Sequence, residues 1–378
     1  VWTVALGDIA ADRALNAASV RTALESGPIP AEKAIELKLL DKTGYPEQAS
    51  EAALEKAGDD AELVDLAYYA APAPSLRAPQ IAIVGGEGAV VTGGGDGNSP
   101  FSSPPGFASD NIARAILDAG KNEKIKAIVF RVDSPGGSPV AADQIWNAIE
   151  RVQADGKPVI VSMGSLAASG GYYVSAGADY IIANRATITG SIGIYGGKFA
   201  IEGGLNKLGI TFDRVSVGGE FADAYGADTF TETQEAAVKD MLKRGYDRFL
   251  GIVADGRGMT YDEVHEVARG RIWSGEDALE VGLVDELGTF IDAIEKAKEL
   301  AGIEADVTPR LVYYPHRPTG LEALESLFGV SAEGAEAAIM LNRLADDKNV
   351  QSLLEQLAAA EAVNSGQTQA VIPRFRER

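Results

Sequence analysis

Two apolar segments, each ending in a run of small residues, constrain this chain more than any other feature. IKAIVFRV (residues 125–132) leads into Ser-Pro-Gly-Gly at 134–137, and KPVIVSM (157–163) leads into Ala-Ala-Ser-Gly-Gly at 167–171. An amphipathic helix is expected between them, over residues 139–153. Strands that alternate with helices predict a parallel sheet with crossover helices, so the expected fold class is α/β.

The second of these small-residue turns carries a serine. Ser169 stands where a strand changes into a helix, the turn that exposes a nucleophilic hydroxyl above a sheet, and only Ala167 departs from the pattern G-x-S-x-G. The turn at 134–137 offers backbone N–H groups without covering side chains, as an oxyanion hole requires. Alone, each turn is more typical of a helix N-cap or an ordinary turn. Together, on successive strands, they favour a serine hydrolase.

Histidine and cysteine usage limits the chemistry available to such a serine. The 378 residues include no cysteine and two histidines, His265 in a charged helical segment and His316 in a turn-rich one. The missing cysteines exclude disulfides, thiolate catalysis and cysteine metal sites, and no cofactor is indicated. With so few histidines, a Ser-His-Asp triad is disfavoured, and a lysine base is expected instead.

Charge and hydropathy exclude further classes. The net charge is −21 and no Lys/Arg-rich run occurs among aromatic residues, so nucleic acid is not an expected partner. The glycine-rich stretch at 93–97 lacks the lysine of a phosphate-binding loop. No apolar run is long enough to cross a bilayer.

An internal repeat suggests how the domains are organised. AIELKLLDKTG (34–44) parallels ALEVGLVDELG (278–288), and matched residues such as Asp41 and Asp285 are 244 positions apart. We therefore expect two tandem copies of one fold, with only the end of the first copy present and a further segment upstream of Val1. The expected division is residues 1–66 for this remnant, 67–79 for a proline-rich linker, 80–303 for the catalytic domain and 304–378 for a helical extension and tail.

Four motifs occur in an order that resembles one family. SPGG, MGSLAASGGYY, TGSIGIYGG and GRIWSGEDALEVGLVDELG together resemble the signal peptide peptidase A (protease IV) family, in its long two-domain form, over about residues 81–301. The resemblance implies a crotonase-like fold related to the Clp protease, and a Ser/Lys dyad. It places the nucleophile at Ser169, the oxyanion N–H donors at Gly137 and Gly170, and a serine that positions the base lysine at Ser191.

The base lysine itself has no clear counterpart. In single-domain members it follows the TGSIG motif, but the matching position here holds Ala222. In the long form the first copy supplies the base, and the repeat spacing places that lysine upstream of Val1. Lys198, in IYGGKFA, is the alternative within the chain.

The resemblance also implies the biological setting. Expected substrates are remnant signal peptides bound as extended strands. The glycine spacing of segment 187–195 itself allows two structures, an open edge for an added peptide strand or an ordinary buried strand. Expected partners are further copies of the chain, as a tetramer, and the inner membrane at its periplasmic face, through an upstream anchor. Two other readings stay open: a crotonase-like acyl-CoA hydratase or isomerase, and a non-catalytic assembly subunit.

Overall fold

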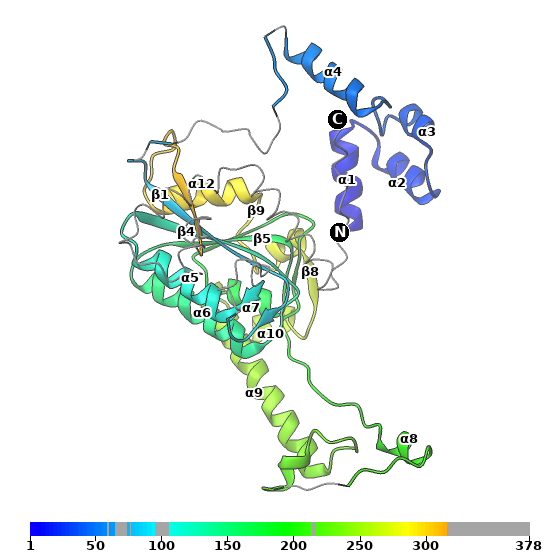
Figure 1. The fold of residues 1–378 in the computed structure, drawn as a ribbon, viewed down its shortest axis with the longest axis vertical. Coiled ribbons are helices and arrows are strands. Elements are labelled where there is room, and N and C mark those ends of the chain that lie inside the picture. Colours follow the sequence, from blue (N-terminus) through cyan, green and yellow to red (C-terminus); the bar gives the residue numbers. More distant parts are fainter. Residues whose placement is uncertain (59, 65–73, 76, 95–105, 214–216, 316–378) are drawn as a thin grey trace, which may run out of the picture.

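A mostly parallel β-sheet forms the centre of the molecule (Figure 1). The structure is a computed structural model that describes residues 1–378 except 59, 65–73, 76, 95–105, 214–216 and 316–378. In this described part the sheet has eight strands, six of them in the order β10-β1-β4-β5-β6-β9, while β7 pairs with β5 and β8. The strands are β1 Gln80–Glu87, β4 Ile125–Ser134, β5 Val159–Ala168, β6 Tyr180–Ala183, β7 Ile188–Gly190, β8 Ile272–Ser274, β9 Glu286–Leu287 and β10 Arg310–Tyr314.

The two apolar segments of the sequence are the central strands. In the sheet register Val129 of β4 lies between Ile83 of β1 and Ile160 of β5, and all three are buried. Every pairing in this sheet is parallel except that of β7 with β8. Strands buried on both faces are near-continuous apolar runs, as these are. The predicted α/β class is confirmed.

Helices cover both faces of the sheet. One face carries α5 Ser109–Lys121, α6 Pro139–Ala154 and α7 Gly170–Ser175, and the larger apolar cluster lies beneath them. The other face carries α12 Phe290–Leu300, whose Ala293 and Ala297 are fully buried against the strands. A two-stranded pair, β2 Val90–Val91 with β3 Phe107–Ala108, lies outside the main sheet.

The last described strand lies beyond the expected domain boundary. β10 pairs in parallel with β1, and Asn122 donates a hydrogen bond to the Tyr314 hydroxyl at 3.0 Å. The sheet therefore continues past residue 303, to residue 314. The expected C-terminal helices and His316 lie outside the described residues.

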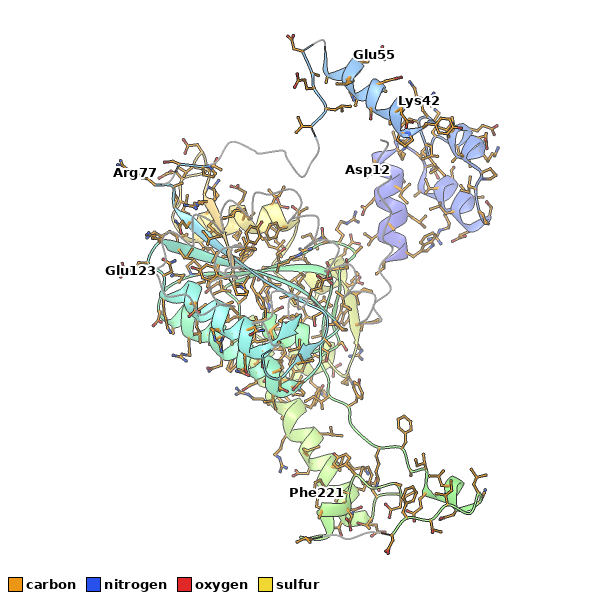
Figure 2. The ribbon with its side chains drawn as sticks, in the orientation of Figure 1. Asp12, Lys42, Glu55, Arg77, Glu123 and Phe221 are labelled. Atoms are coloured by element: carbon orange, nitrogen blue, oxygen red, sulfur yellow. The ribbon has the colours of Figure 1, made fainter. Side chains whose placement is uncertain are left out.

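A long segment between β7 and the body of the domain projects away from the sheet (Figure 1). It contains α8 Glu202–Asn206, the short 3₁₀ helix η1 Glu220–Asp223 and the start of α9 Glu232–Arg257. Thr231 and Gln234 form a capping box at the start of α9. Figure 2 shows the side chains of this projecting segment, with Phe221 labelled, spreading outside the sheet domain.

Four N-terminal helices stand apart from the sheet domain (Figure 1). They are α1 Trp2–Asp12, α2 Ala17–Glu25, α3 Ala31–Glu36 and α4 Pro46–Ala57. Three of them begin 244 residues before a later helix: α2 before α10 Tyr261–Val267, α3 before α11 Gly275–Glu280, and α4 before α12. An ion pair from Arg185 to Asp8 of α1 joins the two parts. The sequence repeat is thus also a repeat of secondary structure.

Candidate active site

Ser169 lies between β5 and α7 in a strained backbone conformation. Its φ is 54° and its ψ is −119°, which an L-residue adopts only when its surroundings hold it there. Two backbone hydrogen bonds do so: the Ser169 N–H donates to the Gly190 carbonyl at 2.9 Å, and its carbonyl accepts from the Tyr173 N–H at 2.8 Å. Strain of this kind is typical of functional residues.

The Ser-Pro-Gly-Gly turn packs directly against this serine. The register between β4 and β5 shifts after Val132, and Ser134 then lies beside Ala167. A Cβ atom added to Gly136 would lie 2.6 Å from the Gly170 nitrogen and 2.7 Å from the Ser169 Cβ. Only glycine permits so close an approach, at a φ of 100°. The glycine of this turn therefore allows the two motifs to meet.

Two N–H groups remain available at this junction. Gly170 is the first residue of α7, so its N–H has no partner within the helix. Neither this N–H nor that of Gly137 donates a backbone hydrogen bond among the described residues. A Cβ added to Gly170 would lie 3.1 Å from the Gly137 nitrogen, so the two groups lie close together. Paired donors beside a serine are the arrangement that stabilises an oxyanion.

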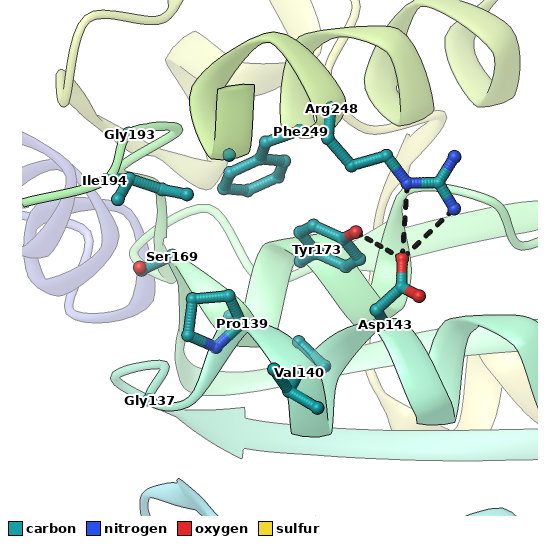
Figure 3. A pocket seen from close by; sticks show the side chains of 13 residues that line it. Gly137, Pro139, Val140, Asp143, Ser169, Tyr173, Gly193, Ile194, Arg248 and Phe249 are labelled. Atoms are coloured by element: carbon teal, nitrogen blue, oxygen red, sulfur yellow. Dashed lines mark hydrogen bonds and ion pairs between the residues drawn. The ribbon is translucent and has the colours of Figure 1, made fainter. Parts of the chain in front are cut away.

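A cavity of about 290 Å³ opens beside the serine (Figure 3). Its walls near Ser169 are mainly apolar, and its polar groups are a carboxylate, a phenol and a guanidinium. The lining residues are Gly137, Pro139, Val140, Ala142, Asp143, Ser169, Gly170, Tyr173, Gly193, Ile194, Gly245, Arg248 and Phe249. A concave apolar pocket with a few polar groups is the common form of a binding site.

Three polar side chains meet at one oxygen of this pocket. Asp143 Oδ1 accepts hydrogen bonds from the Tyr173 hydroxyl at 2.6 Å and from Arg248 Nη2 at 3.1 Å. Burial, and then the hydrogen bond to Asp143, raises the pKa of the Tyr173 phenol well above its ordinary value. The raised pKa favours the neutral phenol, which donates its O–H to Asp143.

Ser191 lies one residue beyond the carbonyl that binds the nucleophile. It has a φ of 50°, and its N–H donates to the Arg271 carbonyl at 2.7 Å. Since Gly190 accepts the Ser169 N–H, the backbone links the two serines directly. Ser191 is not among the residues that line the pocket.

The segment 187–195 is only partly open: its first half is a paired strand, the second of the two structures that the sequence allowed. Strand β7 pairs with β5 on one side and β8 on the other. Ile192 continues this pairing, because its carbonyl accepts from the Gly270 N–H at 2.9 Å. Beyond it, Gly193 and Ile194 line the pocket. Backbone without hydrogen bonds to other described residues thus begins beside the pocket.

Lys198 lies outside the pocket lining. Its Nζ atom is 3.5 Å from Asp228 Oδ1 and 4.5 Å from the centre of the Phe230 ring. Its side chain is 7% exposed. The structure therefore brings together Ser169, Gly137 and Gly170, places Ser191 next to them through the backbone, and leaves Lys198 outside the cavity.

Comparison with known proteins agrees with this geometry. The family model of Peptidase family S49 matches residues 151–304, and that of Clp protease matches residues 107–191. A Synechocystis sp. protein named as a protease is 37% identical over 205 residues, which cover 53% of this chain and 73% of that protein. The chain belongs to peptidase family S49. The predicted recognition is confirmed, and so is the Clp-protease-like fold.

This S49 chain matches some longer relatives over only part of their own length. "Protease 4" of Salmonella typhi is 38% identical over 262 residues, which cover 69% of this chain and 41% of that protein. "Serine protease SPPA, chloroplastic" of Arabidopsis thaliana is 33% identical over 288 residues, 76% of this chain and 40% of that protein. The chain spans about two fifths of the length of these two relatives.

Sequence reasoning missed the polar group of Asp143, Tyr173 and Arg248. The sequence could have indicated Tyr173, since it follows Ser169 by four residues and so lies one turn along the same short helix. It gave no indication that Arg248 and Asp143 meet, because they are 105 residues apart. Among the described residues no group of acidic or histidine side chains could hold a metal ion, and no helix there is long and apolar enough to span a bilayer.

Proposed function

We propose that the unit around the central sheet is a serine endopeptidase domain with Ser169 as its nucleophile. The observation that carries this proposal is the strained Ser169 turn, which lines the pocket next to the N–H groups of Gly137 and Gly170. Membership of family S49 and the printed name of the Arabidopsis relative support the same chemistry.

The mechanism follows from this arrangement. A neutral base removes the proton from the Ser169 hydroxyl, and the oxygen attacks a peptide carbonyl. The Gly137 and Gly170 N–H groups donate hydrogen bonds to the oxyanion that forms. The protonated base then transfers its proton to the leaving amine, and water hydrolyses the acyl-enzyme by the same steps.

We propose a lysine outside the pocket lining as this base. Within the described part of the chain, the lining includes no lysine and no histidine. The amine of Lys198 is already engaged by Asp228 and Phe230. A lysine supplied by a first copy of the fold fits these facts, and we propose that Ser191, next to Gly190, orients its ammonium group.

The proposed substrates are extended peptides, with remnant signal peptides as the physiological class. The backbone beyond Ile192 borders the pocket, so a substrate strand could pair there and place one side chain between Pro139, Val140 and Phe249. A pocket of about 290 Å³ with such walls suits small and medium apolar side chains. Location at the periplasmic face of the inner membrane belongs to the same proposal.

We also propose that the chain forms a homo-oligomer through its projecting segment. This segment exposes large apolar side chains that a single copy leaves in water: Tyr195 is 98%, Val217 91% and Phe199 90% exposed. Patches of this kind mark interaction sites. Substituting Phe199 and Val217 with serine is expected to reduce the mass measured by light scattering; an unchanged mass would contradict this interface.

The domain division is proposed in a revised form. Residues 1–66 form the end of a first copy of the fold, 67–79 the linker and 80–314 the sheet domain. The support is the common spacing of helices and ion pairs in the two helical regions.

The decisive experiment uses a fluorogenic peptide with small apolar residues, measured from neutral to alkaline pH. The assay uses the full-length protein, with its complete first copy, because that copy is proposed to supply the base. We expect hydrolysis that Ser169→Ala abolishes and that rises with pH, because a lysine amine, with an ordinary pKa of about 10.4, must be neutral to act as a base. Retained activity in Lys198→Ala would place the base elsewhere; its loss, in a folded protein, would assign the base to Lys198.

A fluorophosphonate probe adds a test that does not depend on turnover. We expect covalent labelling of Ser169, and none in Ser169→Ala. Hydrolysis that persists in Ser169→Ala, or an activity maximum near an acidic pH of about 5, where a lysine is charged, would overturn the serine–lysine proposal.

A further inference from the structure

The pocket beside Ser169 contains an ion pair whose charges cancel. Asp143 Oδ1 accepts from Arg248 Nε at 3.3 Å and from Arg248 Nη2 at 3.1 Å (Figure 3). Both residues line the pocket, and their side chains remain 44% and 55% exposed. A side chain that enters the pocket can therefore reach this pair.

The pair is held in place from three elements. Asp143 belongs to α6, Arg248 to α9 and the third partner, Tyr173, to α7. The Tyr173 ring packs against Phe249 with ring centres 4.8 Å apart. The guanidinium of Arg248 also lies over the ring of Trp146, 4.9 Å from its centre. A pair fixed by packing on several sides keeps its geometry when a ligand arrives.

We propose that the Asp143–Arg248 pair determines substrate specificity by excluding charged side chains from this pocket. A basic side chain would meet the Arg248 guanidinium, which already occupies the carboxylate. An acidic one would meet Asp143. An uncharged side chain meets apolar walls and a neutral pair. Discrimination of this kind comes from repulsion of the wrong ligand as much as from contacts with the right one.

Removal of either charge should change which substrate side chain the pocket prefers. Asp143 Oδ2 has no hydrogen-bond partner among the described residues, so a carboxylate freed from Arg248 could bind an ammonium or a guanidinium. Arg248→Gln leaves that negative charge in the pocket, and Asp143→Asn leaves the positive charge of Arg248. The double variant is neutral again. Asp143 and Arg248 are thus specificity residues, and neither takes part in the transfer of a proton.

This inference rests on the proposed function, and its test uses three peptides that differ only at the residue before the scissile bond: leucine, lysine or glutamate. We expect Arg248→Gln to raise the lysine-to-leucine ratio of kcat/KM about tenfold, and Asp143→Asn to raise the glutamate-to-leucine ratio similarly, as for a partly exposed charge contact. Arg248→Lys and the double variant Asp143→Asn/Arg248→Gln should keep the parent ratios. Because each number is a ratio within one protein sample, a loss of folded protein does not affect it.

The same peptides are also titrated calorimetrically into each variant carrying Ser169→Ala, which separates the two proposals. Hydrolysis with ratios that change less than about twofold in both single variants would overturn the specificity proposal alone. Binding preferences that switch as expected, without hydrolysis by any variant of the full-length protein with its complete first copy, would support it and overturn the peptidase proposal. If neither hydrolysis nor a switch in binding is seen, both are overturned.

Discussion

The two helical regions at residues 2–57 and 246–300 contain the same ion pair in different surroundings. Arg13 binds Asp41 through both terminal nitrogens, at 2.9 and 2.8 Å, and its Nε donates to the Lys38 carbonyl at 2.8 Å. Arg257 binds Asp285 in the same way, at 2.9 and 2.6 Å, and its Nε donates to the Gly282 carbonyl at 3.0 Å. Each of the three residues in the first region is 244 positions before its counterpart in the second.

The surroundings differ because only the second region lies on the sheet. Asp285 also accepts the Ile181 N–H of β6 at 2.7 Å, and its own N–H donates to the Ile181 carbonyl at 2.9 Å. The Asp285 side chain is 27% exposed, whereas that of Asp41 is 82% exposed. Asp41 has no backbone partner among the described residues. Local sequence thus builds the helices and the ion pair, and the sheet decides how much of them is buried.

The largest difference between the regions is expected when the acid of each pair is removed. Asp285→Ala leaves the largely buried Arg257 and the Ile181 N–H without their acceptor, which should cost about 2–3 kcal/mol of unfolding free energy. Asp41→Ala removes an exposed pair and should leave the global unfolding transition unchanged. Urea unfolding measures both. Equal effects would show that Asp41 is buried in solution.

A larger side chain at matched positions of α12 and α4 should lower the stability of the protein only in α12. Ala297 is fully buried against the sheet, so Ala297→Leu should cost about 1–3 kcal/mol. Its counterpart Ala53 is exposed, and α4 has no buried residue, so Ala53→Leu should be tolerated. The midpoints of thermal unfolding of the two variants, each compared with that of the parent protein, measure this difference. A loss for Ala53→Leu comparable to that for Ala297→Leu would mean that α4 is covered.

Helix caps should affect the two regions alike, because a cap acts locally. Thr260 caps α10 by accepting from the Glu263 N–H, and Asn16 caps α2 by accepting from the Ala18 and Ser19 N–H groups. Thr260→Ala and Asn16→Ala should each destabilise their helix by about 1 kcal/mol. Hydrogen exchange of the amides in each helix measures this locally. A change for one helix only would indicate that tertiary contacts replace the missing cap.

The smallest expected effect is on the titration of the exposed pair. The hydrogen bond from Arg13, and then its charge, lower the pKa of the Asp41 carboxyl below its ordinary value. A depressed carboxyl pKa stabilises the folded form above the unfolded pKa, and this contribution is lost as pH falls through the folded pKa. NMR titration should show a lowered midpoint that Arg13→Gln returns towards the ordinary value. An unchanged midpoint in Arg13→Gln would contradict the pairing.

The sequence predicted the centre of the site better than its walls. The Ser169 turn and the Gly136–Gly137 turn are local patterns at the ends of two strands of a parallel sheet, so they had to lie near one another. Strand β10 was not assigned to the domain, because its pairing with β1 joins residues far apart in the chain. The pairing of β7 with β8 was missed for the same reason, because the projecting segment separates these two strands in the sequence.

By itself the sequence determined the α/β class, the strand-to-helix turn at Ser169 and the spacing of 244 between the two helical regions. The first two depend on periodicity and small residues within short segments, and the third on the similarity of two such segments. Only the tertiary structure decided that Gly137 and Gly170 present their N–H groups together, that Asp143 meets Arg248 in the pocket, and that Asp285 is buried while Asp41 is exposed. Those outcomes depend on which distant segments pack on the sheet, and local preferences do not encode that packing.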